Sequence, residues 1–194
     1  MLICAGLDIH RLMAGLIGKS NSRSSIIQSL CETSTKAVLD KFFAEHLSLS
    51  QEDANELHYR YYREHGLAIE GLVRHHKVDP IEYNSKVDDA LPLEDIIKPD
   101  PDLRKLILDI DTSKVRLWLF TNAYITHGKR VVKLLKVDDL FEGITFCDYG
   151  SEKFYCKPHP DMFDKAMEEA GIKSNEKCYF VGPWMHRTYT TKPC

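Results

Sequence analysis

Apolar residues in the first half of the chain recur with the spacing of helices. Between residues 24 and 46 they recur with roughly helical spacing, at Ile27, Leu30, Val38, Phe42 and Phe43. Ser50, followed by acidic residues, is typical of a helix N-terminus, and the helix after it is expected to end at Gly66. A third short helix follows, and the Asp-Pro pair at residues 79–80 is typical of the start of a fourth. Residues 24–98 are therefore predicted to be almost entirely helical.

From residue 99 onward, helical spacing alternates with continuous apolar runs. The predicted elements are a helix opened by the Asp-Pro pair at 100–101, a strand at 115–120, a helix at 129–135, a strand at 144–147, a helix at 160–170 and a strand at 178–181. Such alternation predicts an α/β fold with a doubly wound, Rossmann-like sheet, whose sites lie at the carboxyl ends of strands. No apolar strand followed by Asp-x-Asp is recognised near the N-terminus. We therefore expect an incomplete sheet that lacks its first strand.

Composition narrows the possible partners and the compartment. The 194 residues carry a net charge of -3, which provides no basic surface for nucleic acid or for an anionic membrane, so neither partner is expected. Six cysteines show no C-x-x-C spacing, which indicates reduced intracellular thiols rather than a zinc site. Residues 1–18 contain Asp8, His10 and Arg11, and so fit neither a secretory leader nor a membrane span. A cytoplasmic location is expected, with the nucleus as the alternative.

Two short polar motifs stand out in the alternating region. Thr121 and Asn122 come directly after the strand at residues 115–120, and Lys157 precedes the helix at 160–170. A hydroxyl group and backbone amides past a parallel strand bind phosphate oxygens, and a lysine ammonium offsets the charge of a transferring phosphoryl group. These three residues are predicted to bind phosphate, with Thr121 and Lys157 also as catalytic residues. Taken singly, the motifs are equally consistent with a helix cap and a surface lysine.

Other residues near these motifs give weaker signals. His127 and His159 lack the spacing of a metal-ligand pair, which favours packing or solvent-facing roles. Cys156 is next to a lysine, an arrangement that lowers a thiol pKa, yet no His or Asn partner marks it as a nucleophile. Tyr61 and Tyr62 are suited to stacking on a base, but their helical spacing favours a place in the core.

Several stretches together resemble one known superfamily. Leu-Phe-Thr-Asn-Ala at residues 119–123 looks like motif II of the haloacid dehalogenase (HAD) superfamily, and Lys-Pro at 157–158 looks like motif III. Residues 61–72, followed by Leu-Pro-Leu at 91–93 and Lys-Pro-Asp at 98–100, are similar to the cap and its exit in pyrimidine 5'-nucleotidase-like proteins of fungi and plants. The resemblance implies an inserted α-helical cap on a Rossmann-like core.

On this resemblance the chain divides into four segments. They are a divergent N-terminal segment at 1–23, a mainly helical cap region at 24–98, a HAD-like α/β core at 99–182 and an unrelated tail at 183–194. We expect the two divergent ends to come from altered splicing or from a gene model that extends into non-coding sequence.

The resemblance also implies a set of chemical groups, part of which is missing. In this family an Asp attacks the phosphate to form an aspartyl-phosphate, a second Asp handles the leaving-group proton, and Mg²⁺ offsets the repulsion between the two anions. Leu-Asp-Ile-His at residues 7–10 is the closest match to motif I, with Asp8 as the nucleophile candidate and His10 in the second position. Pro-Trp-Met-His at 183–186 stands where the acids of motif IV are expected, so no metal ligand is identified.

Three hypotheses on function follow. The first is a phosphomonoester hydrolase of the pyrimidine 5'-nucleotidase type that acts on nucleoside monophosphates, with impaired activity in this chain. The second is a non-catalytic fragment or pseudoenzyme that binds a phosphorylated ligand through Thr121 and Lys157, or a partner protein through its helical half. The third is a HAD hydrolase that acts on another small phosphomonoester or on a haloacid. The missing acids favour the second, and the cap sequence disfavours the third.

Overall fold

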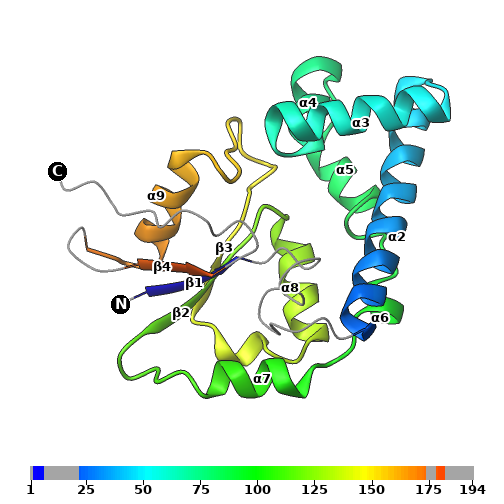
Figure 1. The fold of residues 1–194 in the computed structure, drawn as a ribbon. Helices are drawn as coiled ribbons and strands as arrows, with labels where there is room; N and C mark the ends of the chain where they lie inside the picture. The colour runs from blue at the N-terminus through cyan, green and yellow to red at the C-terminus, as the bar shows by residue number, and fades with distance from the viewer. Residues whose placement is uncertain (1, 7–21, 174–177, 182–194) are drawn as a thin grey trace.

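The computed structural model describes residues 2–6, 22–173 and 178–181, which form a parallel sheet with flanking helices and a further group of helices (Figure 1). In chain order the elements are β1 (Leu2–Gly6), α2 (Ser22–Leu47), α3 (Gln51–His65), α4 (Ala68–His76), α5 (Pro80–Lys86), α6 (Leu93–Ile96), α7 (Pro101–Leu108), β2 (Arg116–Phe120), α8 (Ile125–Leu134), the 3₁₀ helix η1 (Asp138–Leu140), β3 (Gly143–Thr145), α9 (Pro160–Glu169) and β4 (Cys178–Val181).

The four strands form one sheet in the order β3-β2-β1-β4, and every pairing is parallel. The predicted α/β class is confirmed. The expectation that the sheet lacks its first strand is wrong, because β1 lies between β2 and β4 and pairs with both. This strand is five residues long and contains two small residues, so its own sequence is a weak strand signal. The two parallel neighbours, rather than local propensity, account for its place in the sheet.

Helix boundaries follow the capping residues of the sequence. Ser50 caps α3, its hydroxyl accepting a hydrogen bond of 3.1 Å from the Asp53 backbone N–H. Gly66 ends that helix at φ 81°, a left-handed conformation that favours glycine. Asp79 and Asp100 cap α5 and α7, each followed by a proline at the first helical position. These predictions are confirmed, whereas α8 begins four residues earlier than residue 129.

Helices cover both faces of the sheet, which is the doubly wound arrangement. Leu117 and Leu119 of β2 belong to a buried cluster with Val131 of α8 and Leu103 of α7. Phe120 of the same strand packs on the other face, within the cluster that contains α9. Because successive side chains of a strand point to opposite faces of the sheet, α7 and α8 pack on one face and α9 packs on the other.

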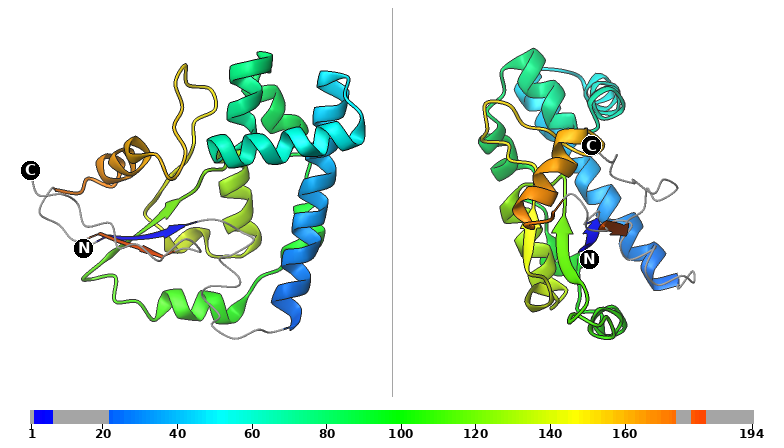
Figure 2. Two further views of the ribbon diagram at one scale, coloured as in Figure 1. Left: turned by 45° about the horizontal axis from the view of Figure 1, so that its top comes forward. Right: turned by 90° about the vertical axis from the view of Figure 1, so that its left-hand side faces the viewer.

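The helical part, α2 to α5, is joined to the sheet by a common apolar core. Phe43 and Leu72 of this part lie in the same buried cluster as Phe120 of β2 and Met162 of α9. Figures 1 and 2 show α2 running along one side of the molecule, with α3 and α4 beyond the carboxyl ends of the strands. The helical part is thus positioned over the edge of the sheet where a site is expected.

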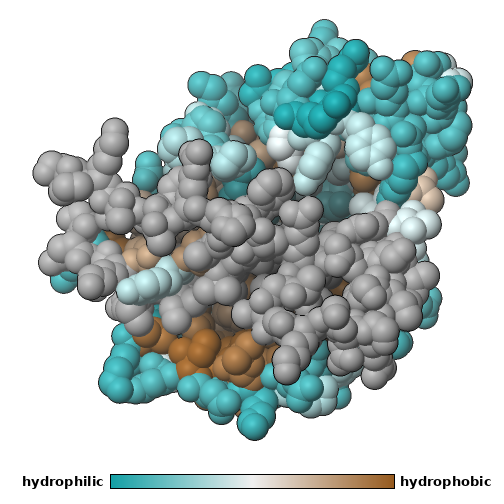
Figure 3. All heavy atoms as spheres, viewed as in Figure 1, coloured by the Kyte–Doolittle hydropathy of each residue, from teal (hydrophilic) through white to brown (hydrophobic). Residues whose placement is uncertain are grey.

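The surface differs between the two parts. On the face shown in Figure 3, the atoms over α3 and α4 are mostly hydrophilic, whereas hydrophobic side chains gather beside α7. Leu106 and Leu108 of α7 are exposed. None of the helices that the structure describes has the length and apolar character needed to cross a membrane. The segment boundaries at residues 23, 98 and 182 stay a prediction.

Candidate phosphate-binding site

Thr121 stands at the carboxyl end of β2, fully buried, where the strand turns toward α8. Its backbone N–H donates to the Thr145 carbonyl at 2.9 Å, which extends the pairing of β2 and β3 by one step. Its hydroxyl accepts a hydrogen bond of 3.0 Å from the Ala123 N–H. The hydroxyl group is therefore held at the first turn after the strand, as the sequence predicted.

Asn122 joins the two sequence motifs. Its side-chain amide donates to the Lys157 carbonyl at 3.0 Å, and its side-chain carbonyl accepts from the Lys157 N–H at 2.7 Å. The paired bonds clamp the segment before α9 against the end of β2, across 35 positions of sequence. Asn122 thus has a defined role in the fold, in addition to the phosphate contact predicted for it.

The Lys157 side chain turns toward the end of β2. Its ammonium donates to the Phe120 carbonyl at 2.8 Å and lies 4.8 Å from the centroid of the Phe120 ring and 5.4 Å from that of Phe180. Aromatic faces attract a cation and displace water from around it. The structure therefore brings together Thr121, Asn122 and Lys157, which we call the cradle, and places a positive charge at the edge of the sheet.

Comparison with known proteins identifies the family of the chain. The model of the haloacid dehalogenase-like hydrolase family matches residues 9–182. The chain belongs to this family. Phosphate metabolism protein 8 of Saccharomyces cerevisiae is similar to it, with 38% identity over 167 residues that make up 82% of this chain and 51% of that protein. The chain thus spans about half the length of this curated relative.

Solved structures were compared in the same way. The L-2-haloacid dehalogenase of Xanthobacter autotrophicus with covalently bound chloropropionic acid is 15% identical, at a TM-score of 0.46, over 92% of this chain and 68% of that one. A dehalogenase with an intermediate complex is 12% identical, at a TM-score of 0.45, over 92% of this chain and 74% of that one. The predicted membership of the HAD superfamily is confirmed by the family match, while the nucleotidase branch stays a prediction.

The position of β1 bears on the motif I candidate of this HAD-like hydrolase. Gly6, the last residue of β1, pairs with Phe120, the last residue of β2. The two strands therefore end side by side, and Asp8 comes two residues after that point in the sequence. Asp8 and His10 themselves lie outside the described residues. The register of β1 places the sequence match to motif I after a central strand, as the family requires.

The metal expected for this family has no ligand set among the residues that the structure describes. No group of three or more His, Cys, Asp or Glu side chains is arranged there to hold an ion. Asp8 and residues 183–186, where the sequence resemblance predicts motifs I and IV, lie outside that part of the chain.

The secondary candidates prove to be structural. Cys156 is buried, and burial, with Glu70 nearby, raises the pKa of its thiol to about 12, so the neighbouring lysine does not activate it. His159 caps α9 by accepting a hydrogen bond from the Asp161 N–H at 3.3 Å. Tyr61 is buried as expected, but the core placement predicted for Tyr62 is wrong, since 48% of that residue is exposed.

Two residues of the site region were missed by the sequence analysis. The Tyr149 hydroxyl donates to the Asn122 carbonyl at 3.1 Å, and its ring stacks on that of Tyr124 with centroids 5.4 Å apart. Asp88, from the segment that returns from α5 to the sheet, lies within electrostatic range of Tyr149. Neither residue belongs to a recognisable motif, and their proximity to the cradle is a product of the tertiary fold.

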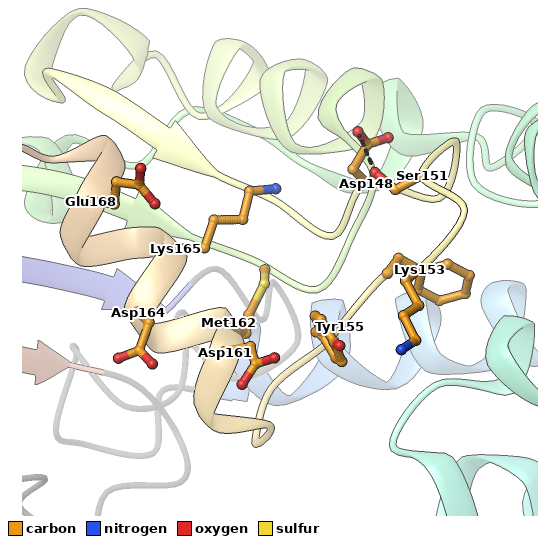
Figure 4. A pocket seen from close by; sticks show the side chains of 10 residues that line it. Asp148, Ser151, Lys153, Tyr155, Asp161, Met162, Asp164, Lys165 and Glu168 are labelled. Carbon is orange, nitrogen blue, oxygen red and sulfur yellow. Dashed lines mark hydrogen bonds between the residues drawn. The ribbon is translucent and has the colours of Figure 1, made fainter.

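A hollow of about 350 Å³ lies elsewhere, between α9 and the loop that precedes it (Figure 4). Asp161, Asp164 and Glu168 of α9 line it, together with Lys153 and Lys165. The Lys165 ammonium donates to the Phe146 carbonyl at 3.0 Å and partly neutralises this acidic wall. An excess of carboxylates repels phosphate, so the hollow is poorly suited to the ligand that the cradle is suited to bind.

Proposed function

We propose that this HAD-like hydrolase releases phosphate from small phosphomonoesters, nucleoside monophosphates in particular. The observation that carries the proposal is the cradle itself, where one hydroxyl group, one ammonium group and the turn after β2 converge at the carboxyl end of a parallel strand. The likeness to a phosphate metabolism protein supports the phosphoryl class.

Each cradle residue is assigned a separate task. The Thr121 hydroxyl and the amide N–H groups of the following turn donate hydrogen bonds to the phosphate oxygens and hold them in a fixed orientation. The Lys157 ammonium offsets the negative charge that these oxygens carry as the P–O bond to the substrate breaks. Asn122 positions Lys157 through the two main-chain bonds at 2.7 and 3.0 Å. A displacement of this clamp moves the ammonium relative to Thr121.

Asp8 is the nucleophile in this proposal, on the basis of the register of β1. Its carboxylate forms a bond to phosphorus as the P–O bond to the substrate breaks, and the leaving oxygen takes a proton from water to become the alcohol. Water then hydrolyses the acyl phosphate, which returns the carboxylate and inorganic phosphate. Mg²⁺ supplies charge neutralisation in this family when it is bound. Because the described residues offer it no ligand set, no step is assigned to the metal.

The test is release of inorganic phosphate from uridine and cytidine monophosphates, with Mg²⁺ or with a chelator. Lys157→Ala is expected to lower turnover roughly a hundredfold or more, as loss of one transition-state contact does. Lys153→Ala, which removes an exposed lysine from the loop before α9, is the matched control and should leave turnover unchanged. Asp8→Asn should abolish turnover. Equal turnover in wild type and Lys157→Ala would contradict the proposal.

A second candidate function is phosphate-ligand binding without turnover. It is favoured by His10 at the second acid position of motif I and by the residues at 183–186 in place of motif IV acids. Under this alternative, inorganic phosphate binds to wild type and not to Lys157→Ala, yet no nucleotide is hydrolysed. Direct titration with phosphate alongside the turnover assay distinguishes the two functions.

A further inference from the structure

The segment that returns from α5 to the sheet is fixed beside the cradle. The Thr126 hydroxyl donates to the Asp89 carboxylate at 3.0 Å, and His127 Nδ1 lies 3.3 Å from the Asp88 carbonyl. Both partners belong to the first turn of α8, the helix that starts three residues after Asn122. The segment that carries Asp88 is therefore fixed to the first turn of α8, between the helical part and the sheet.

The two neighbouring acids of this segment differ in their contacts. The Asp89 carboxylate accepts hydrogen bonds from Asn84 at 2.9 Å and from Thr126 at 3.0 Å, so its oxygens are occupied by the fold. The Asp88 carboxylate makes no hydrogen bond or ion pair with any residue that the structure describes. It is partly exposed and has free acceptor capacity.

Asp88 is connected to the cradle through Tyr149. Tyr83 and Tyr149, both buried, are within electrostatic range of it, and the Tyr149 hydroxyl donates to the Asn122 carbonyl. Burial, and then the charge of Asp89, raise the pKa of the Asp88 carboxyl to about 7. A carboxylate enclosed in this way without a partner destabilises the fold, and such groups are found preferentially at functional sites.

We propose that Asp88 is a substrate-binding residue whose carboxylate accepts a hydrogen bond from a hydroxyl group on the organic portion of the phosphomonoester. The proposal rests on the proposed function and adds a determinant of substrate choice to it. In a nucleoside monophosphate, the ribose hydroxyls are the donors of this kind. A phosphomonoester without such a hydroxyl group leaves the Asp88 carboxylate without this hydrogen bond and binds more weakly.

The experiment measures equilibrium binding to the full chain by titration calorimetry. The ligands are uridine monophosphate, its dideoxy analogue that lacks both ribose hydroxyls, and inorganic phosphate. Wild type is expected to prefer the ribonucleotide roughly tenfold, the value of one hydrogen bond to a charged group. Asp88→Ala should reduce the preference below about twofold, while its affinity for inorganic phosphate stays equal or rises because a repelling charge is lost.

Two further variants keep the result interpretable. Asp88→Asn retains the shape of the side chain and reports the same loss of preference if the alanine variant does not fold. Asp102→Asn removes an exposed charge from α7 and should leave all three affinities unchanged. A variant at Asp88 with the preference of wild type overturns the inference alone. If wild type and Lys157→Ala both fail to bind phosphate, the proposed function fails and the inference fails with it.

Discussion

Two regions of the molecule enclose an acidic side chain in opposite ways. One is the contact between α2 and α3. The other is the return segment, residues 87–92 between α5 and α6, which lies beside the cradle. Asp40 of α2 is only 3% exposed and accepts hydrogen bonds from Lys36 at 2.6 Å and from Asn55 at 2.8 Å, with His58 Nδ1 at 3.3 Å. Asp88 is the less buried of the two, and its carboxylate has no such partner among the described residues.

The pKa values of the two carboxyls shift in opposite directions for this reason. Burial alone would raise the pKa of Asp40, but hydrogen bonds from Lys36 and Asn55 outweigh burial and hold the pKa below its usual value. At Asp88 burial is not opposed, and the pKa rises to about 7. Hydrogen-bond partners, more than depth of burial, decide whether the folded state favours the charged form of a carboxyl group. The helical part encloses a satisfied carboxylate, and the site region keeps an unsatisfied one available.

The largest effect is expected at Asp40. Asp40→Ala leaves the buried His58 and the partly buried Asn55 without their acceptor, and should lower the free energy of unfolding at pH 7 by about 3 kcal/mol. Urea denaturation measures this change. Glu45→Ala removes an exposed acid from the same helix and should change stability by less than about 0.5 kcal/mol. Equal effects of the two substitutions would show that the buried network adds nothing to stability.

A smaller effect of opposite sign is expected at Asp88. The unfolded chain loses the Asp88 proton near pH 3.8, whereas the folded chain keeps it until about pH 7, so stability falls as the pH rises between these values. The gap corresponds to roughly 4 kcal/mol, and solvent screening of a partly exposed side chain reduces it to about 2 kcal/mol. Asp88→Asn should therefore stabilise the protein by about 2 kcal/mol at pH 8.

The pH dependence provides the control for that prediction. Below pH 3.8 the Asp88 carboxyl is protonated in both the folded and the unfolded state, so Asp88→Asn should gain little stability there, and the gain should grow as the pH rises toward 7. Burial lowers the pKa of His58, with Asp40 opposing the shift, so protonation of His58 destabilises wild type and variant alike as the pH falls through 6.5. Only the difference between the two proteins at each pH is diagnostic. A variant less stable than wild type at pH 8 would contradict the prediction.

Features with a local chemical signature were predictable from the sequence. The Asp-Pro starts of α5 and α7 are encoded within two residues, because the capping side chain and the proline act on the adjacent turn. The alternation of strands and helices after residue 99 is likewise local. Thr121 and Lys157 were recognisable because each motif lies beside the end of a strand or the start of a helix.

Features that depend on distant partners were not predictable. β1 is a strand because β2 and β4 flank it, which its five residues do not indicate. Asp88 and Asp89 form an ordinary acidic pair in the sequence, and only the fold gives one of them partners and leaves the other without. The clamp made by Asn122 depends on a backbone segment 35 residues away. Such contacts arise from tertiary packing and leave no periodic trace.

The smallest effect is expected at Arg130 of α8, whose guanidinium also holds the return segment. Its guanidinium donates to both oxygens of Glu94 and to the carbonyls of Asp89 at 3.0 Å and Leu91 at 2.8 Å. Lysine keeps the charge but lacks the planar fork, so Arg130→Lys should cost only about 1 kcal/mol of stability at this partly exposed pair.

The same substitution tests whether the position of Asp88 depends on the contacts that Arg130 makes with the return segment. If the return segment loosens in Arg130→Lys, water reaches Asp88 and the pKa of its carboxyl moves back toward the usual value. The stabilising effect of Asp88→Asn at pH 8 should then shrink in the Arg130→Lys background, which a double-mutant cycle measures directly. If the effects of the two substitutions on stability are strictly additive, packing against Tyr83 and Tyr149, and not the contacts of Arg130, encloses the carboxylate. In either case the cycle identifies the contacts that keep an unsatisfied acid beside the cradle.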